Sequence, residues 1–156
     1  GMAFESMEGK DDFNLAIDWS TTNPEMAVYI LDENFNYLPF QPSRGQMQWH
    51  EQKVVFEHIY PNIDLIVHPA QNGKIGYEFV VYPGGDPSQI QLKCDAFSEN
   101  NERILASKLE ASQDGAGVTE EDVQVAFQKE QGSLTFQVDG YEYAQALTIS
   151  FLLEMK

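Results

Sequence analysis

The chain has 156 residues, with 25 acidic against 9 basic side chains, a formal net charge of −16 and one cysteine, Cys94. A domain of this length buries roughly 68–70% of its unfolded surface, so a single core suffices without a disulfide or a metal, and we expect no cofactor. The acidic balance disfavours nucleic acid as a partner. The lone cysteine excludes an internal disulfide, and no apolar run approaches the roughly 20 residues of a membrane-spanning helix, so we expect no membrane insertion.

The opening segment, residues 1–12, is polar and has no periodic pattern. Gly1 before Met2 is typical of a cleaved expression tag. We therefore predict that residues 1–12 are disordered or tag-derived and that residues 13–156 form a single domain. No basic segment followed by an apolar stretch opens the chain as a signal peptide would.

Apolar residues at alternating positions predict the first strands. The pattern of residues 13–19 is typical of a half-buried strand. Residues 26–31 are apolar on both faces, which predicts a central strand covered from two sides. Residues 37–48 read as a surface connection, and residues 54–60 and 63–67 as two further strands separated by a Pro-Asn break.

Turn sequences predict how the next strands pair. Asn72–Gly73 is a strong hairpin signal and joins residues 63–67 to a strand over residues 75–82. The turn at residues 83–88 (PGGDPS) then reverses the chain into the alternating residues 89–94. The prediction is an antiparallel meander.

The second half of the chain is less regular. Residues 100–112 fit one short helix or an irregular strand through Leu105, Leu109 and Ala111, and the strand is preferred. Strands follow near residues 123–127 and 134–138.

Asp139–Gly140 predicts a second hairpin, which leads into the closing strand near residues 143–153. The strand spacing along the whole chain predicts an all-β fold, an antiparallel β-sandwich of about nine strands.

Two short sequences within residues 56–97 carry a family resemblance. Residues 60–65 (YPNIDL) and 83–90 (PGGDPSQI) resemble, in order, a segment of a bacterial extracytoplasmic domain of unknown function that often precedes SBBP (β-propeller-type) repeats. Asn62 stands where that family usually has Gly, and Gly76 where an acidic residue is common. The resemblance implies a sandwich-like module of a secreted or surface protein, and it brings no catalytic residues.

The three histidines, His50, His58 and His68, are the first candidates for a metal or general-base site. Their spacings of eight and ten residues match no metal motif. His58 is expected on one strand face with Val54, Phe56 and Tyr60. Convergence of His58 with His68 across adjacent strands would still lack a third ligand, so no metal residue is predicted.

Cys94 beside Asp95 is a candidate nucleophile. Its alternation with Ile90 and Leu92 instead favours a small buried apolar residue.

A calcium loop is suggested by Asp32, Asn34 and Asn36. Tyr37 stands at the position that needs Gly, and Ser43 at the position that needs Glu, so an EF-hand is excluded. A looser calcium site in acidic loops remains an alternative to ordinary solvated turns.

Aromatic residues suggest a platform for stacking sugar rings, with core packing as the alternative. Trp19 is in register with core residues, which leaves Trp49 and Tyr37 as the surface candidates. The full set is Trp19, Trp49, Tyr29, Tyr37, Tyr60, Tyr77, Tyr82, Tyr141 and Tyr143.

No phosphate-binding glycine loop, nucleophile elbow or zinc-protease helix is present, and paired carboxylates mean little without geometry among 25 acids. We therefore predict no catalytic residues and a non-catalytic accessory or interaction domain of a periplasmic or extracellular bacterial protein, with a protein or glycan partner. Its ligand-binding residues are unassigned. The alternative is a carbohydrate-binding module that uses exposed aromatics, and an enzyme with scattered carboxylates ranks third.

Overall fold

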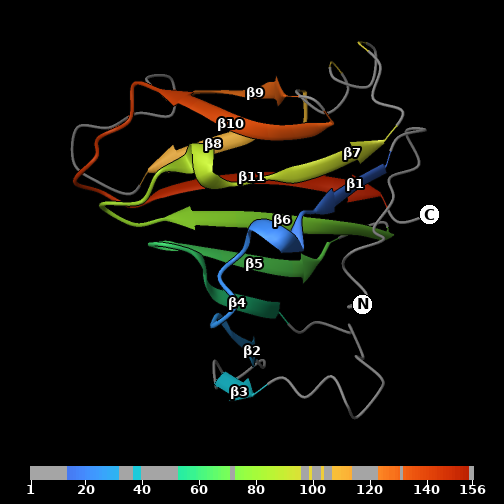
Figure 1. Ribbon diagram of the computed structural model, residues 1–156, viewed down its shortest axis with the longest axis vertical. Coiled ribbons are helices and arrows are strands. Elements are labelled where there is room, and N and C mark those ends of the chain that lie inside the picture. Colours follow the sequence, from blue (N-terminus) through green and yellow to red (C-terminus); the bar gives the residue numbers. More distant parts are fainter. Residues whose placement is uncertain are drawn as a thin grey trace.

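A computed structural model describes residues 14–31, 37–39, 53–70, 73–95, 99, 103, 107–113, 123–130 and 132–154. In this part of the chain, two antiparallel sheets pack as a sandwich, which confirms the predicted fold class (Figure 1). Residues 1–13, for which a disordered or tag-derived segment and the start of a strand were predicted, lie outside it. Within the described residues, no helix has the length and apolar character needed to cross a membrane.

The larger sheet has seven strands in the order β3-β2-β4-β5-β6-β11-β8. Their bounds are β2 Ala27–Leu31, β3 Tyr37–Pro39, β4 Lys53–Tyr60, β5 Ile63–Pro69, β6 Lys74–Val81, β8 Glu110–Gln113 and β11 Leu147–Glu154. The strands from β6 through β5, β4 and β2 to β3 follow one another along the long axis of the molecule (Figure 1). The predicted hairpins β4–β5 and β5–β6 are confirmed.

The smaller sheet has four strands in the order β1-β7-β10-β9. Their bounds are β1 Asn14–Ile17, β7 Leu92–Asp95, β9 Gln124–Glu130 and β10 Ser133–Asp139. The described residues thus form eleven strands rather than about nine. The sequence did not resolve the short strands β3 and β8, because three or four residues are too few to display a period of two.

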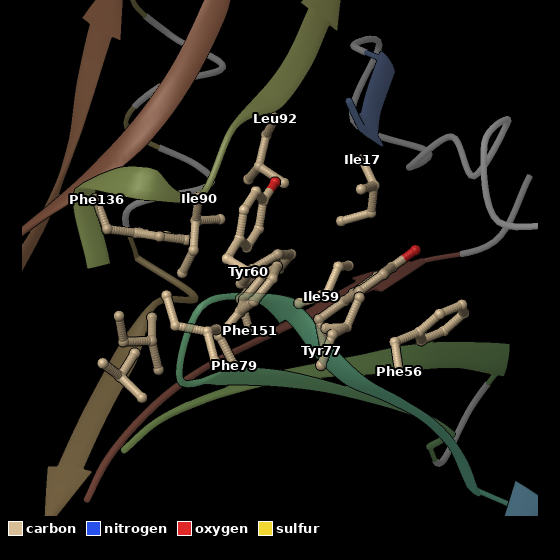
Figure 2. Close-up of a cluster of buried hydrophobic side chains, with 14 of the residues drawn as sticks. Ile17, Phe56, Ile59, Tyr60, Tyr77, Phe79, Ile90, Leu92, Phe136 and Phe151 are labelled. Atoms are coloured by element: carbon tan, nitrogen blue, oxygen red, sulfur yellow. The ribbon is translucent and has the colours of Figure 1, made fainter. Parts of the chain in front are cut away.

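Large apolar side chains from the two sheets form one core. Phe136 of β10 packs against Phe79 of β6 and Phe151 of β11, with ring centroids 5.9 and 6.3 Å apart. Figure 2 shows these rings together with Ile90 and Leu92, both almost fully buried. Aromatic side chains bury the largest area per residue, so this cluster contributes heavily to holding the sheets together.

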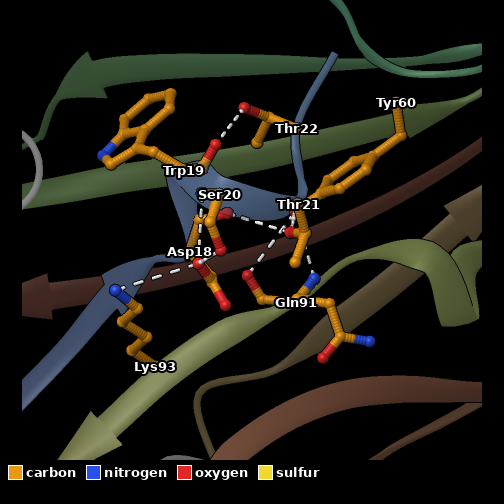
Figure 3. Close-up of polar contacts among 8 residues, drawn as sticks. All are labelled: Asp18, Trp19, Ser20, Thr21, Thr22, Tyr60, Gln91 and Lys93. Carbon is orange, nitrogen blue, oxygen red and sulfur yellow. Dashed lines mark hydrogen bonds and ion pairs between the residues drawn. The ribbon is translucent and has the colours of Figure 1, made fainter. Parts of the chain in front are cut away.

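Two connections that pass between the sheets are capped in the same way. Asp18 precedes the short 3-10 helix η1 (Trp19–Thr21), and its carboxylate accepts from the backbone and side chain of Ser20 at 3.1 and 2.6 Å (Figure 3). Asp86 precedes η4 (Pro87–Gln89) and binds Ser88 in the same manner, at 2.9 and 2.7 Å. An Asp that accepts from residue i+2 fixes a local turn, and here each turn directs the chain into the opposite sheet.

A buried tyrosine links the connections to the hairpin β4–β5. The Tyr60 hydroxyl accepts from the Gln91 backbone N–H at 3.1 Å and lies 3.4 Å from the hydroxyl of Thr21 (Figure 3). These contacts join β4 of the larger sheet to the residue before β7 of the smaller one. Burial raises the pKa of Tyr60, so its hydroxyl remains protonated near neutral pH.

Two predicted pairings are wrong. β7 does not continue the meander from β6, because it pairs with β1 and β10 in the smaller sheet. Asp139–Gly140 does not close a hairpin either, since β10 pairs with β9 while β11 pairs with β6 and β8. In both places the turn exists, but the chain crosses to the other sheet.

Two further predictions need correction. β2 lies between β3 and β4 as an inner strand, but its side chains are half-buried rather than covered on both faces. In the ambiguous region, Glu99 and Arg103 are helical, while Glu110–Gln113 is strand β8. The preference for a strand is thus confirmed for residues 110–113, and a helix reaching residue 112 is wrong.

Candidate functional site

His58 does not lie where the alternation placed it. A bulge interrupts β4 between Phe56 and Tyr60, and His58 within it has a positive φ of 55°. Its side chain is exposed, so the prediction that it shares a face with Val54, Phe56 and Tyr60 is wrong, because the extra residue of a bulge breaks the alternation.

His68 occupies a separate place on the other end of β5. Its ring covers Gly76 of β6, where any side chain would collide with the imidazole, and its Nε2 lies 3.4 Å from Glu78 Oε1. Asp64, which binds the His58 backbone, lies four residues earlier on β5, a distance of about 13 Å along a strand. The two histidines therefore do not converge. No group of three His, Cys, Asp or Glu side chains within the described residues could hold a metal ion.

Several predicted candidates lie outside the described part of the chain. They are Trp49, His50, Asp32, Asn34, Asn36 and Ser43, together with the side chains of Tyr37, Cys94 and Asp95. The backbone of Cys94 lies in β7 opposite Leu15. Its expected neighbours on the apolar face, Ile90 and Leu92, are buried as predicted.

The aromatic residues divide between the core and one surface region. Trp19 lies in η1 rather than in a strand, and its ring contacts Phe56 at 5.4 Å, which agrees with the expected core packing. Among the described aromatics, Tyr143 is 75% exposed and Tyr82 is 41% exposed. Both belonged to the tyrosine set but not to the chosen surface candidates.

Tyr82 and Tyr143 face the same hollow, which we call the corner cleft. It has a volume of about 650 Å³ and lies beside the crossing from β6 to β7. Three segments line it: the turn at residues 82–88, strands β9 and β10, and the connection before β11. Its polar and aromatic lining residues are Tyr82, Asp86, Ser88, Gln128, Gln137, Tyr141, Tyr143 and Gln145.

The turn that forms one wall is fixed by close backbone contacts. Gly84 has a φ of +93°, which L side chains rarely adopt. A Cβ at Gly85 would lie 2.8 Å from the Asn62 carbonyl oxygen, so only glycine fits. The Tyr82 N–H donates to that same oxygen at 2.9 Å. The turn is thus held against the β4–β5 hairpin.

β10 holds the same turn from the other side. The Thr135 hydroxyl is buried and donates to the Ser88 carbonyl at 2.9 Å. Together with the Asp86 cap, this contact attaches η4 to the smaller sheet. The wall of the corner cleft is therefore part of the rigid frame.

The Tyr82 ring is held in place by its hydroxyl. This hydroxyl donates to Asp64 Oδ2 at 3.1 Å, and Asp64 Oδ1 accepts from the His58 backbone N–H at 2.8 Å. Asp64 thus serves both the bulge of β4 and the aromatic side chain at the cleft. A half-exposed ring with a fixed hydroxyl loses little conformational entropy when a ligand covers it.

The opposite wall is a pair of tyrosines on an anchored loop. The rings of Tyr141 and Tyr143 meet edge to face, with centroids 4.6 Å apart. Gln113 of β8 binds the same loop through the backbone: its amide donates to the Glu142 carbonyl at 2.9 Å and accepts from the Glu142 N–H at 2.9 Å.

The electrostatic character of the corner cleft is close to neutral. Asp86 is the one charged residue of its lining, and its Oδ1 is occupied by Ser88. Burial, followed by the nearby Tyr143 and Asp86, raises the pKa of Tyr141, so that phenol stays protonated at neutral pH. The cleft can thus offer flat rings, amides and hydroxyls to a ligand.

A family model described as a domain of unknown function (DUF7948) matches residues 10–150. The match extends far beyond residues 56–97, where the resemblance was first apparent, and includes the whole lining of the corner cleft. Neither a curated protein nor a solved structure matches the chain.

Proposed function

The chain belongs to the family described as a domain of unknown function (DUF7948), and from that premise we propose that it is a non-catalytic interaction domain that binds its partner in the corner cleft. One observation carries the proposal: the exposed rings of Tyr82 and Tyr143 line a hollow of about 650 Å³ whose walls are fixed by hydrogen bonds. Ligand sites in proteins commonly have this size and combine aromatic walls with a few oriented polar groups.

The lining supports binding rather than turnover. General acid and base catalysis needs two groups positioned on either side of a reacting bond. The corner cleft offers one carboxylate, Asp86, with an oxygen occupied by the Ser88 N–H and hydroxyl. The remaining polar groups are amides and hydroxyls, which orient a ligand.

The location that we propose is extracytoplasmic, in a bacterial protein. Its support is the resemblance of residues 60–65 and 83–90 to a domain of secreted and surface proteins. The structure gives these residues roles in the fold: Tyr60 joins the sheets, Asn62 and Gly85 make the close turn, and Asp64 holds Tyr82.

The test is an NMR titration of the full chain with three classes of soluble probe: neutral oligosaccharides, an acidic oligosaccharide and decaproline. We expect at least one class to shift the amides of Tyr82, Gln137 and Tyr143, and mass spectrometry to recover every probe unchanged. Conversion of a probe would show an enzyme instead. Shifts that avoid the corner cleft with all three classes would refute the proposal.

A further inference from the structure

The rings of the corner cleft lie on two opposed walls. Tyr82 comes from the turn after β6, whereas Tyr141 and Tyr143 come from the connection between β10 and β11. Tyr143 exposes 75% of its surface and Tyr82 exposes 41%. Exposed rings of this kind offer flat apolar faces with a polar hydroxyl at the edge.

Amide side chains lie between these walls. Gln128 of β9 and Gln137 of β10 are exposed and line the cleft, and Gln145 lines it beside Tyr143. An amide carries both a donor and an acceptor, as does a hydroxyl group of a ligand. The Gln145 Oε1 is buried without a hydrogen-bond partner among the described residues, so reorientation of this amide toward a ligand donor is favourable.

Charge restricts the ligand further. The lining holds no Lys, Arg or His, and Asp86 is its single ionised group, on a chain with a net charge of −16. A polyanion would meet repulsion without a compensating cation. The protonated Tyr141 phenol adds one more neutral hydrogen-bonding group.

These features together describe a site for a molecule that has apolar faces, many hydroxyl groups and no negative charge. We infer that the corner cleft binds a neutral oligosaccharide chain, with a sugar face stacked on Tyr143 and Tyr82 and its hydroxyls bound by Gln128, Gln137 and Gln145. This inference rests on the proposed function and names its ligand class. A proline-rich peptide also docks on aromatic grooves, but it offers only acceptors and would leave the amide N–H and C=O groups unequally used.

The experiment is isothermal titration calorimetry of the full chain with cellohexaose, xylohexaose, mannohexaose, laminarihexaose, maltohexaose and chitohexaose. Decaproline and trigalacturonate are the comparison probes. We expect saturable binding of at least one neutral hexasaccharide and none of trigalacturonate, with NMR shifts at the Gln137 and Tyr143 amides.

Three variants locate the binding. Tyr143→Ala removes the most exposed ring and is expected to weaken the hexasaccharide at least about tenfold. Tyr82→Phe keeps the ring but loses the bond to Asp64, and is expected to weaken binding less than Tyr82→Ala. Leu152→Ala, an exposed apolar residue of β11 outside the corner cleft, is the matched control and should leave the affinity unchanged.

The possible outcomes separate the two proposals. Decaproline binding in the cleft without any hexasaccharide binding would overturn the inference and leave the proposed function standing. Hexasaccharide binding that Tyr143→Ala and Tyr82→Ala both leave intact would place the site elsewhere and overturn the inference. Absence of cleft shifts with every probe would overturn both.

Discussion

Asn62 combines a strained backbone with two structural contacts. It has a φ of +58° in the turn between β4 and β5, and its carbonyl accepts from the Tyr82 N–H. Asparagine tolerates this left-handed conformation better than most residues, and glycine adopts it freely. This explains why a position occupied by Gly in the resembling family carries Asn here.

Substitution at Asn62 should follow the cost of the left-handed conformation. We expect Asn62→Ala to lower the free energy of unfolding by about 1 kcal/mol and Asn62→Val by about 2 kcal/mol, because a Cβ is unfavourable at this φ. Asn62→Gly should be within about 0.5 kcal/mol of the wild type. Urea denaturation measures all three, and equal losses for Gly and Val would contradict the argument.

Tyr77 makes stability depend on alkaline pH. Burial raises the pKa of its phenol far above the usual value of about 10. In the unfolded chain the phenol ionises near pH 10, whereas the folded state keeps it protonated. The stability linked to this group is therefore complete below about pH 10 and is lost progressively as the pH rises above it.

A Tyr77→Phe variant should remove this dependence. We expect its free energy of unfolding to fall less steeply than that of the wild type between about pH 10 and 11.5, with both proteins behaving alike near pH 8. The stacking of residue 77 on Phe151, at 5.1 Å, is kept by the phenyl ring. Urea denaturation at each pH measures the slopes, and parallel curves would exclude Tyr77 as the source.

At the scale of the element, the turn at residues 82–88 directs the chain from one sheet to the other. Its glycine at position 85 approaches the Asn62 carbonyl so closely that a methyl group would lie 2.8 Å away. Gly132, in the β9–β10 hairpin, also has a positive φ of 81°, but an added Cβ there meets nothing within 4 Å. The two positions therefore separate steric contact from backbone strain.

Gly85→Ala should displace the turn as a unit. We expect a loss of about 2–3 kcal/mol in the free energy of unfolding, with NMR shifts at Asn62 and Tyr82, because backbone must move to admit the methyl group. Gly132→Ala, the matched control, should cost about 1 kcal/mol with changes confined to its hairpin. If Gly85→Ala were as mild as the control, the close packing of this turn would be refuted.

At the scale of the whole molecule, the sequence predicted faces better than sheets. Alternation correctly buried Ile90 and Leu92, and Asn72–Gly73 correctly predicted the β5–β6 hairpin, because both signals are local. Whether a strand after a turn joins its predecessor or the opposite sheet leaves the same residues buried. The crossing of β7 into the smaller sheet was therefore invisible to a pattern of period two.

The corner cleft was harder to predict than the fold. Its walls come from segments around residues 82, 137 and 143, which only the crossing of β7 and β11 between sheets brings together. A single tyrosine has no local pattern that separates core from surface. Tyr143 had one available signal, its position among polar residues just after Asp139–Gly140, but that signal was read as the start of the closing strand.

The net charge of −16 also acts on the whole molecule. Charges of one sign repel more strongly when folding brings them together, and salt screens this repulsion. Within the described residues, a single ion pair involves Lys or Arg, that of Lys93 with Asp18 at 3.8 Å, and its lysine side chain is largely exposed. Screening should therefore relieve more repulsion than it removes attraction.

We expect the free energy of unfolding to rise by on the order of 1 kcal/mol between about 10 mM and 150 mM NaCl, as the Debye length falls from roughly 30 to 8 Å. Urea denaturation at fixed pH measures the change, and KCl should give the same result because screening depends on ionic strength rather than on the cation. Lys93→Met removes the described ion pair and should leave the salt dependence equal or slightly steeper. A stability that falls with added salt would mean that ion pairs, rather than net repulsion, dominate the electrostatics of this fold.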